Sequence, residues 1–255
     1  MIELRDLRAG YGGRTAASVD ELHLEPGRIT VVIGRNGSGK STLLRAICRV
    51  IPYEGTVLVD GQDMAKLSHR ERAQLVAYLP QVLTRPAMSV GTLVGHGRYA
   101  RLGPFRTLGE SDLEAIRASM EECGVSGLRD RMLGELSGGE LQRAYLAMVV
   151  AQDTPYLLLD EPAAHLDVAH RLEVHRLARR LAQEGRGVIM TSHDLVESFA
   201  VADEVCVMKH ATIEASGPAT RIAAQGELLA DAMGVCVRGI EGEGLLYPYA
   251  LAAAD

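Results

Sequence analysis

The sequence predicts an α/β fold in which a mainly parallel sheet carries an inserted helical lobe. Three continuous apolar runs, at 28–33, 156–160 and 187–191, are typical of parallel strands buried on both faces. Stretches of helical character alternate with these runs, which favours a sheet with right-handed crossovers. Residues 82–150 contain no convincing strand, so we expect them to form a lobe inserted between two strands of the sheet.

The first apolar run begins the expected core. It leads into a glycine-rich loop at 34–41 and then into a helical stretch at 41–50. Short strands are expected at 56–59 and 75–79, and the capping box Ser68–Glu71 opens a short helix between them. The core is completed by a helix at 168–183 between the last two runs, with these expected inward positions: Leu172, Leu177 and Leu181.

The lobe and the tail are also expected to be helical. A second capping box, Ser111–Glu114, opens a helix that Gly124 ends, with these apolar positions at helical spacing: Leu113, Ile116, Met120 and Cys123. After Pro218 we expect one amphipathic helix at 222–233 and short extended pieces. The chain is therefore predicted to be a single domain over 1–255, divided as follows: a core at 1–81 and 151–217, a lobe at 82–150 and an appendage at 218–255.

The composition limits the classes of protein to consider. The formal net charge is −6, which argues against a nucleic-acid binder, and no run approaches the ~20 apolar residues of a membrane-spanning helix. The first residues lack the apolar segment of a secretory signal, so we expect a soluble chain. The four cysteines have no paired spacing and are expected to be reduced thiols: Cys48, Cys123, Cys206 and Cys236. The histidines at 165, 170 and 175 are five residues apart and do not share a helical face.

Residues 34–41 form the strongest motif. GRNGSGKS fits the pattern GxxxxGK[ST] between a strand and a helix, where backbone N–H groups can surround a diphosphate. Lys40 is expected to reach the β and γ phosphates, and the Ser41 hydroxyl to ligate Mg²⁺. The predicted ATP-binding residues of this loop are Asn36, Gly37, Ser38, Gly39, Lys40, Ser41 and Thr42.

Two acidic residues end the apolar run at 156–160. At the carboxyl edge of a parallel sheet they would lie beside the phosphate loop. Asp160 is suited to water-mediated binding of Mg²⁺, and Glu161 to polarising an attacking water. A single carboxylate here could instead cap the next helix, but two in tandem after four buried residues favour catalysis.

LSGGELQR, at 136–143, has the ingredients of a second anion site: a serine and two glycines before a helical run. Ser137 and Glu140 also form a capping box, S-x-x-E. A carboxylate aimed at a triphosphate would be repelled, so we expect Glu140 to accept the Ser137 N–H. Ser137, Gly138 and Gly139 would then bind the anion.

The order of these three motifs, with LLLDEP at 157–162, resembles the nucleotide-binding subunit of ABC (ATP-binding cassette) transporters over essentially the whole chain. The resemblance implies a P-loop NTPase (RecA-like) core with a mainly parallel sheet, an N-terminal antiparallel β portion and an inserted helical subdomain. It implies an ATPase that uses Mg²⁺. It also implies a head-to-tail dimer, most simply a homodimer, in which residues 137–140 face the ATP held by the partner.

The resemblance assigns four further residues. Tyr11 would stack on adenine, Gln81 would sense Mg²⁺ and the attacking water, and His193 would contact the γ-phosphate as a catalytic residue. Asp167 would be the acid of the D-loop, at 164–167. The sequence departs from the family pattern at Arg35, where proline is common, and at Ala163 and Ala164, where small polar residues are more usual.

The segment 89–104 resembles the docking segment of importers for iron–siderophore, haem and cobalamin. Six residues match that pattern, while Ala100 stands where proline is usual: Val90, Leu93, Val94, Gly97, Arg98 and Tyr99. This implies the ATPase of a type II metal-chelate importer, peripheral at the cytoplasmic face of the membrane. It would dock on permease subunits through residues near 82–105 and serve a substrate-binding protein indirectly.

Two other functions use the same motifs. One is a soluble ATPase of iron–sulfur cluster assembly, which has no need of an importer-type segment at 89–104. The other is a DNA-repair or translation ATPase, which the acidic charge and the single cassette disfavour. The sequence does not distinguish siderophore, haem and cobalamin as the transported molecule.

Overall fold

The computed structural model describes residues 1–102, 107–164, 166–242 and 245–253. Within these ranges, ten strands form one sheet in the order β5-β4-β1-β2-β10-β9-β3-β8-β7-β6. The strands of this sheet are β1 (Ile2–Tyr11), β2 (Arg14–Leu24), β3 (Ile29–Ile33), β4 (Tyr53–Val59), β5 (Gln62–Asp63), β6 (Val76–Leu79), β7 (Tyr156–Leu159), β8 (Gly187–Ser192), β9 (Glu204–Lys209) and β10 (Thr212–Pro218). A separate pair is formed by β11 (Val235–Gly242) and β12 (Leu245–Ala253).

The sheet is divided into a parallel and an antiparallel part. β9, β3, β8, β7 and β6 are parallel neighbours, whereas β5, β4, β1 and β2 pair antiparallel at the other end. β10 joins the two parts, antiparallel to β9 and parallel to β2. Both the mainly parallel core and the N-terminal antiparallel portion are therefore confirmed.

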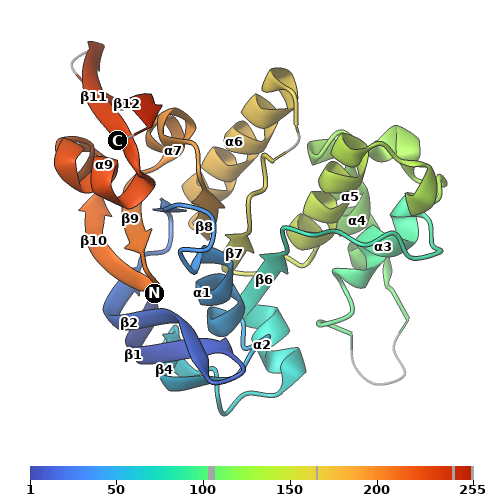
Figure 1. The fold of residues 1–255 in the computed structure, drawn as a ribbon. Helices are drawn as coiled ribbons and strands as arrows, with labels where there is room; N and C mark the ends of the chain where they lie inside the picture. The colour runs from blue at the N-terminus through green and yellow to red at the C-terminus, as the bar shows by residue number, and fades with distance from the viewer. Residues whose placement is uncertain (103–106, 165, 243–244, 254–255) are drawn as a thin grey trace.

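Helices cover both faces of the sheet and build the lobe (Figure 1). Those of the core and tail are α1 (Lys40–Ile47), α2 (His69–Leu75), α6 (Val168–Gln183), α7 (Leu195–Val201), α8 (Ala219–Ala223) and α9 (Gly226–Met233). The lobe consists of α3 (Val90–His96), α4 (Glu110–Glu122), α5 (Gly138–Ala151) and the 3-10 turns η1 (Ser126–Leu128) and η2 (Leu133–Glu135). No helix among the described residues is both long and apolar enough to cross a membrane.

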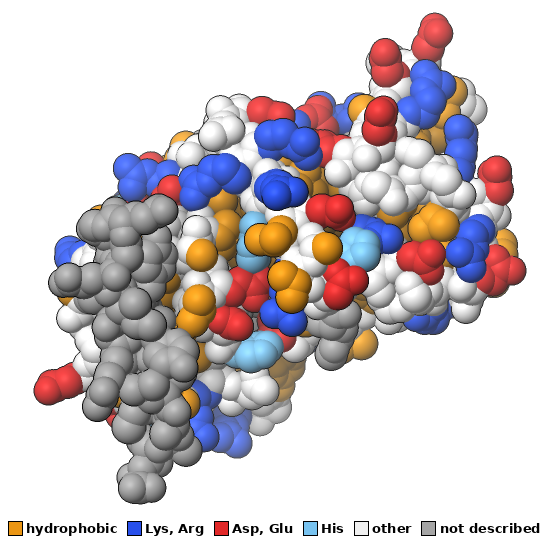
Figure 2. Space-filling view, turned by 90° about the horizontal axis from the view of Figure 1, so that it is seen from above, with side chains coloured by type: hydrophobic (Ala, Val, Ile, Leu, Met, Phe, Trp, Pro, Cys, Tyr) orange, Lys and Arg blue, Asp and Glu red, His pale blue; other side chains and the backbone are white. Residues whose placement is uncertain are grey.

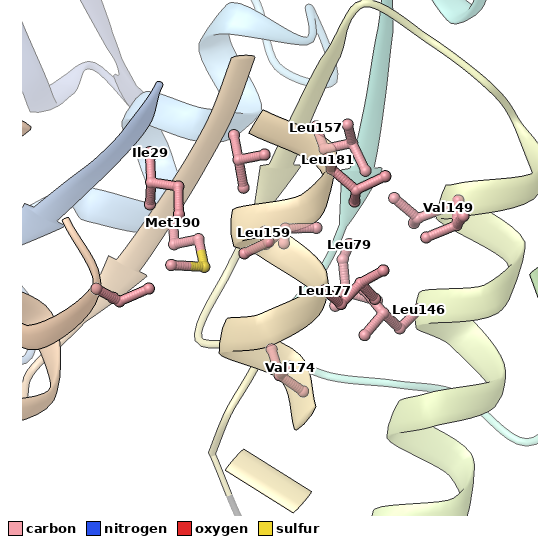
Figure 3. Packing of buried hydrophobic residues seen from close by; sticks show 14 of the residues in the cluster. Ile29, Leu79, Leu146, Val149, Leu157, Leu159, Val174, Leu177, Leu181 and Met190 are labelled. Atoms are coloured by element: carbon pink, nitrogen blue, oxygen red, sulfur yellow. The ribbon is translucent and has the colours of Figure 1, made fainter. Parts of the chain in front are cut away.

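The core has two layers because the side chains of each strand alternate between the faces of the sheet. In β3, Val31 packs with the lobe and α6, while Val32 packs with α1 and the antiparallel strands. All five residues of β3 are buried, as the continuous apolar run predicts. Figure 3 shows Leu177 and Leu181 of α6 between the sheet and Leu146 of α5. The lobe is therefore joined to the core by apolar packing along α6.

Three local predictions are wrong. Leu172 is 48% exposed, because it lies nine residues from the buried Leu181, which is half a turn around the helix. The helix α4 is capped by Gly109 rather than Ser111, since Asp112 lies in its first turn and accepts the Gly109 N–H at 3.1 Å. The described part of the tail contains two helices, α8 and α9, instead of one.

Other local predictions are confirmed. Helix α6 spans 168–183, and the capping box of Ser68 and Glu71 is complete at the start of α2. Gly124 follows α4 with a φ of 63°, as a helix-ending glycine does. The expected apolar positions of α4 are buried except Leu113, which is 38% exposed.

Candidate functional site

Several of the predicted site residues meet at the carboxyl ends of β3, β7 and β8. A cavity of about 380 Å³ opens there, lined by Asn36, Gln81, Glu161 and His193 together with residues of α6 and α7. Figure 2 shows histidine and carboxylate side chains gathered in the middle of this face. Ligands of parallel α/β sheets bind at this edge, because the loops after successive strands converge on it.

The phosphate loop is folded around the Lys40 ammonium. Lys40 Nζ donates to the carbonyls of Gly34 at 2.7 Å and Arg35 at 3.2 Å, and the side chain is buried. Burial lowers the pKa of Lys40, and the neighbouring carboxylates partly offset this. Gly39 must be glycine, since a Cβ there would lie 2.1 Å from the Ala16 carbonyl oxygen at a φ of 108°. Ser38 Oγ is buried without a hydrogen-bond partner among the described residues, which fits a hydroxyl that binds a ligand.

Ser41 and Asp160 form the candidate metal site. Asp160 is fully buried, and its Oδ1 accepts the Ser41 hydroxyl at 2.9 Å and the Thr191 hydroxyl at 2.7 Å. The Tyr78 hydroxyl lies 3.3 Å from Oδ2, and burial raises the pKa of Tyr78, which keeps it a donor. A hydroxyl beside a carboxylate supplies the oxygen ligands that Mg²⁺ prefers when phosphates provide the rest.

Glu161 lies beside His193. Its Oε2 is 3.4 Å from His193 Nδ1, and its side chain is 10% exposed. The backbone of Glu161 has a φ of 49°, and its N–H donates to Thr191 Oγ1 at 2.8 Å. This geometry directs one carboxylate into the cavity while the preceding Asp160 stays buried.

Tyr11 and Asp167 lie outside the residues that line the cavity. Tyr11 ends β1, is 49% exposed and accepts a hydrogen bond from Arg45 of α1 at 3.2 Å. Asp167 is the N-cap of α6 and accepts the His170 N–H at 2.9 Å. His165, in the predicted D-loop, lies outside the described residues.

The residues of LSGGELQR do not line the cavity of their own chain either. Ser137 is the N-cap of α5, where Glu140 Oε2 accepts the Ser137 N–H at 2.8 Å and Ser137 Oγ accepts the Glu140 N–H at 3.3 Å. The predicted capping box is confirmed, and hydrogen bonding from Ser137, above all from its backbone N–H, lowers the pKa of Glu140. The backbone N–H groups of Gly138 and Gly139 lie in the first turn of α5, where N–H groups have no partner within the helix. The start of α5 contacts the D-loop instead, with Gly139 packed near Leu166.

Most of the pattern-matching residues of the expected docking segment, 89–104, pack inside the lobe rather than lying on its surface. Val90, Leu93 and Val94 are buried, and Arg98 is held by Asp112 at 2.9 Å and by the Ala151 carbonyl at 2.9 Å. A Cβ on Gly97 would lie 2.3 Å from the Met148 carbonyl oxygen, so the pattern needs glycine there. Tyr99 is 53% exposed. Residues 103–105 lie outside the described residues.

Sequence reasoning missed a close histidine–carboxylate contact in the wall of the cavity. His175 Nε2 of α6 lies 2.7 Å from Glu197 Oε1 of α7, and this partner lowers the pKa of Glu197. Glu197 also lies in the first turn of α7, whose N-cap is Asp194. Asp194 accepts the Glu197 N–H at 3.0 Å, but the Glu197 carboxylate faces His175. Sequence reasoning also missed Thr191. The signal that could have found it is a polar residue near the end of a buried strand.

Comparison with known proteins finds close relatives. The sequence model described as ABC transporter matches residues 18–164. The iron(3+)-hydroxamate import ATP-binding protein FhuC of Bacillus subtilis is 35% identical over 224 residues, 87% of this chain and 83% of its own. The hemin import ATP-binding protein HmuV of Chelativorans sp. is 38% identical over 231 residues, covering 85% of each.

The fold is shared with solved structures. An ABC transporter described as of the metal-chelate type, in an inward-facing conformation, has a TM-score of 0.79 at 23% identity and covers 98% of this chain and 96% of its own. The dimeric ATP-binding cassette MJ0796, bound to ADP and Pi, has a TM-score of 0.77 at 21% identity and covers 86% and 99%.

Proposed function

Because the chain belongs to the ABC transporter family, we propose that it is the ATP-hydrolysing subunit of an importer for a metal chelate. The observation that carries this proposal is the likeness to import subunits for iron chelates and haem over more than four fifths of both chains. It favours import over the alternative of a non-transport ATPase. Which chelate is carried is not encoded in the site, because this subunit does not contact the cargo.

The residues of the site suggest how ATP is held. Lys40 exchanges its bonds to the Gly34 and Arg35 carbonyls for the β and γ phosphates, and Tyr11 stacks on adenine. The phosphate loop donates its N–H groups, together with the Ser38 hydroxyl. Ser41, Asp160 and Gln81 would hold Mg²⁺, which neutralises charge on the β and γ phosphates.

Hydrolysis is assigned to Glu161 and His193. Glu161 orients the attacking water and accepts its proton, while His193 contacts the γ-phosphate and keeps Glu161 in place. Ser137, Gly138 and Gly139 of the partner complete the site, and Asp167 lies at the same interface. A second copy of this chain is the simplest partner.

Coupling to transport is proposed to run through permease subunits. They would dock on residues near 82–105, including the exposed Tyr99, and hold this chain at the cytoplasmic face of the membrane. A substrate-binding protein would deliver the chelate from the other side. Closure of the ATP-bound dimer would then move the permease, and hydrolysis would reset it.

The decisive test is the ATPase activity of Glu161→Gln. We expect this variant to bind ATP and dimerise but to hydrolyse it at least about 100-fold more slowly. Glu173→Gln, a matched change at an exposed site on α6, should keep full activity. Normal turnover by Glu161→Gln would remove the assignment of the base. Co-purification with a polytopic membrane protein tests the importer, and recovery of none would count against it.

A further inference from the structure

Arg85 connects the segment after β6 to the turn that precedes Ser137. Its Nη1 donates to the Leu136 carbonyl at 2.6 Å and to the Leu133 carbonyl at 3.1 Å. Both carbonyls belong to η2 and the residue that follows it, directly before Ser137. Hydrogen bonds from a charged donor are about twice as strong as neutral ones, so this turn is held firmly.

The peptide unit between Leu136 and Ser137 is held at both ends. Arg85 binds its carbonyl, and Glu140 Oε2 accepts its N–H at 2.8 Å. A peptide unit is planar and rigid, so fixing both groups fixes its orientation. That orientation sets the direction of the Ser137 side chain and of the first N–H groups of α5.

The same segment also reaches the nucleotide cavity. Arg85 follows Gln81, which lines the cavity, by four residues. Between them, Thr84 is tied to the lobe, because the buried Tyr145 hydroxyl of α5 donates to the Thr84 carbonyl at 3.0 Å. One short segment therefore contacts the cavity at one end and the LSGGELQR turn at the other.

We propose that Arg85 is a positioning residue that orients Ser137 toward the ATP held by the partner. This inference rests on the proposed function, in which Ser137 serves the partner's nucleotide and Gln81 serves its own. Arg85 therefore acts on the opposite site of the dimer from Gln81. Movement of Gln81 when ATP binds in one site would act through Arg85 to change the orientation of Ser137, which the same chain contributes to the other site.

A mixed dimer separates the two sites. One copy carries Glu161→Gln, so that the only competent site combines the phosphate loop of the other copy with LSGGELQR of the first. We expect Arg85→Met in the first copy to slow single-turnover hydrolysis about tenfold or more, since a lost charged hydrogen bond is worth about that factor. Arg85→Met in the second copy should change it less than about twofold. Equal or reversed effects would overturn the proposal.

Matched variants distinguish positioning from general damage. Arg85→Lys in the first copy keeps a charged donor and should recover most of the rate. Arg117→Met, at an exposed arginine on α4, should have no effect in either copy. A rate with Arg85→Lys as low as with Arg85→Met, or a loss with Arg117→Met of the same size, would contradict the proposal.

A second measurement does not depend on hydrolysis. In the Glu161→Gln chain, Arg85→Met should raise the dissociation constant of the ATP-induced dimer about tenfold by analytical ultracentrifugation. Binding of a fluorescent ATP analogue to the monomer should stay the same. Unchanged dimerisation overturns the role of Arg85, whereas normal turnover by Glu161→Gln homodimers overturns the proposed function itself.

Discussion

Thr191 is the residue whose loss should reveal how the two acidic residues are held. Its side chain is 1% exposed, and its hydroxyl donates to Asp160 at 2.7 Å while accepting the Glu161 N–H at 2.8 Å. Thr191→Val keeps the shape of the side chain and replaces the hydroxyl with a methyl group. We predict that this change lowers both the stability and the catalytic rate.

The cost in stability follows from the two hydrogen bonds. The bond to the Asp160 carboxylate is worth about 1.5–3 kcal/mol, and a buried N–H left without a partner costs about 1–3 kcal/mol. The added methyl group returns about 0.8 kcal/mol. The net loss is then about 2–5 kcal/mol, which in a chain of this length lowers Tm by about 5–15 °C.

The catalytic effect comes from Glu161. Its backbone is held in the left-handed region by the bond that Thr191→Val removes. When that residue relaxes, the carboxylate moves relative to the attacking water, and a displacement of about 1 Å costs roughly 100-fold in rate. We therefore expect kcat to fall about 10- to 100-fold while ATP still binds.

Thermal unfolding by circular dichroism and steady-state ATPase assays measure the two effects. Thr191→Ser is the control, because it keeps the hydroxyl and loses only a methyl group. It should cost about 1 kcal/mol and keep kcat within about threefold. A Thr191→Val protein as stable and as active as Thr191→Ser would refute this account of the site.

Three further predictions follow from the same structure. Glu140→Gln should keep ATPase activity within about threefold of the wild type, because glutamine also completes a capping box. Ser137→Arg should abolish ATPase activity without weakening ATP binding to the monomer. Steady-state assays and equilibrium titration check both variants, and equal loss of activity in the two would contradict the role of Glu140. Leu181→Ala, in the layer between α6 and the sheet, should lower the free energy of unfolding by about 2–5 kcal/mol in urea titration, whereas the exposed Leu172→Ala should cost less than about 1 kcal/mol. The Gly109 N–H and Arg98 lower the pKa of Asp112, so its contribution is complete above the unfolded pKa of about 3.9 and is lost as the pH falls through the lower folded value; in melts between about pH 5 and 2, Asp112→Asn should lose less stability on acidification than the wild type, and parallel curves would contradict this.

Much of the fold could be predicted because its signals are local. Buried parallel strands appear as continuous apolar runs, and the phosphate loop is a single contiguous motif. The antiparallel strands β1 and β2 were expected only from the family resemblance, although the alternating burial along β1 carries a signal of period two. Leu172 misled because apolar character alone does not fix the face of a helix.

The residues of the candidate site also divide into those with local sequence signals and those whose contacts join distant parts of the chain. Glu140 could be assigned to its own helix end, since both groups of the capping box lie within one turn. The contacts of Thr191 and Arg85 could not be predicted, because they join residues 30 and 51 positions apart along the chain. The pairing of β7 with β8 brings Thr191 to Glu161, and the bridge between Ser89 and Met132 lies beside the contact of Arg85 with Leu136.

That division bears on how the two half-sites of the proposed dimer would communicate. The residues proposed to bind phosphate and metal lie at strand ends of the core, whose relative positions the sheet fixes. Ser137 lies on the lobe, and besides the apolar contacts with α6 it is tied to the core side through the segment that carries Arg85. In the proposal above, a change at Gln81 would act on the orientation of Ser137 through Arg85. The contact of Arg85 with Leu136, which sequence patterns miss, is then the one through which ATP bound in one site would alter the orientation of Ser137 at the other site.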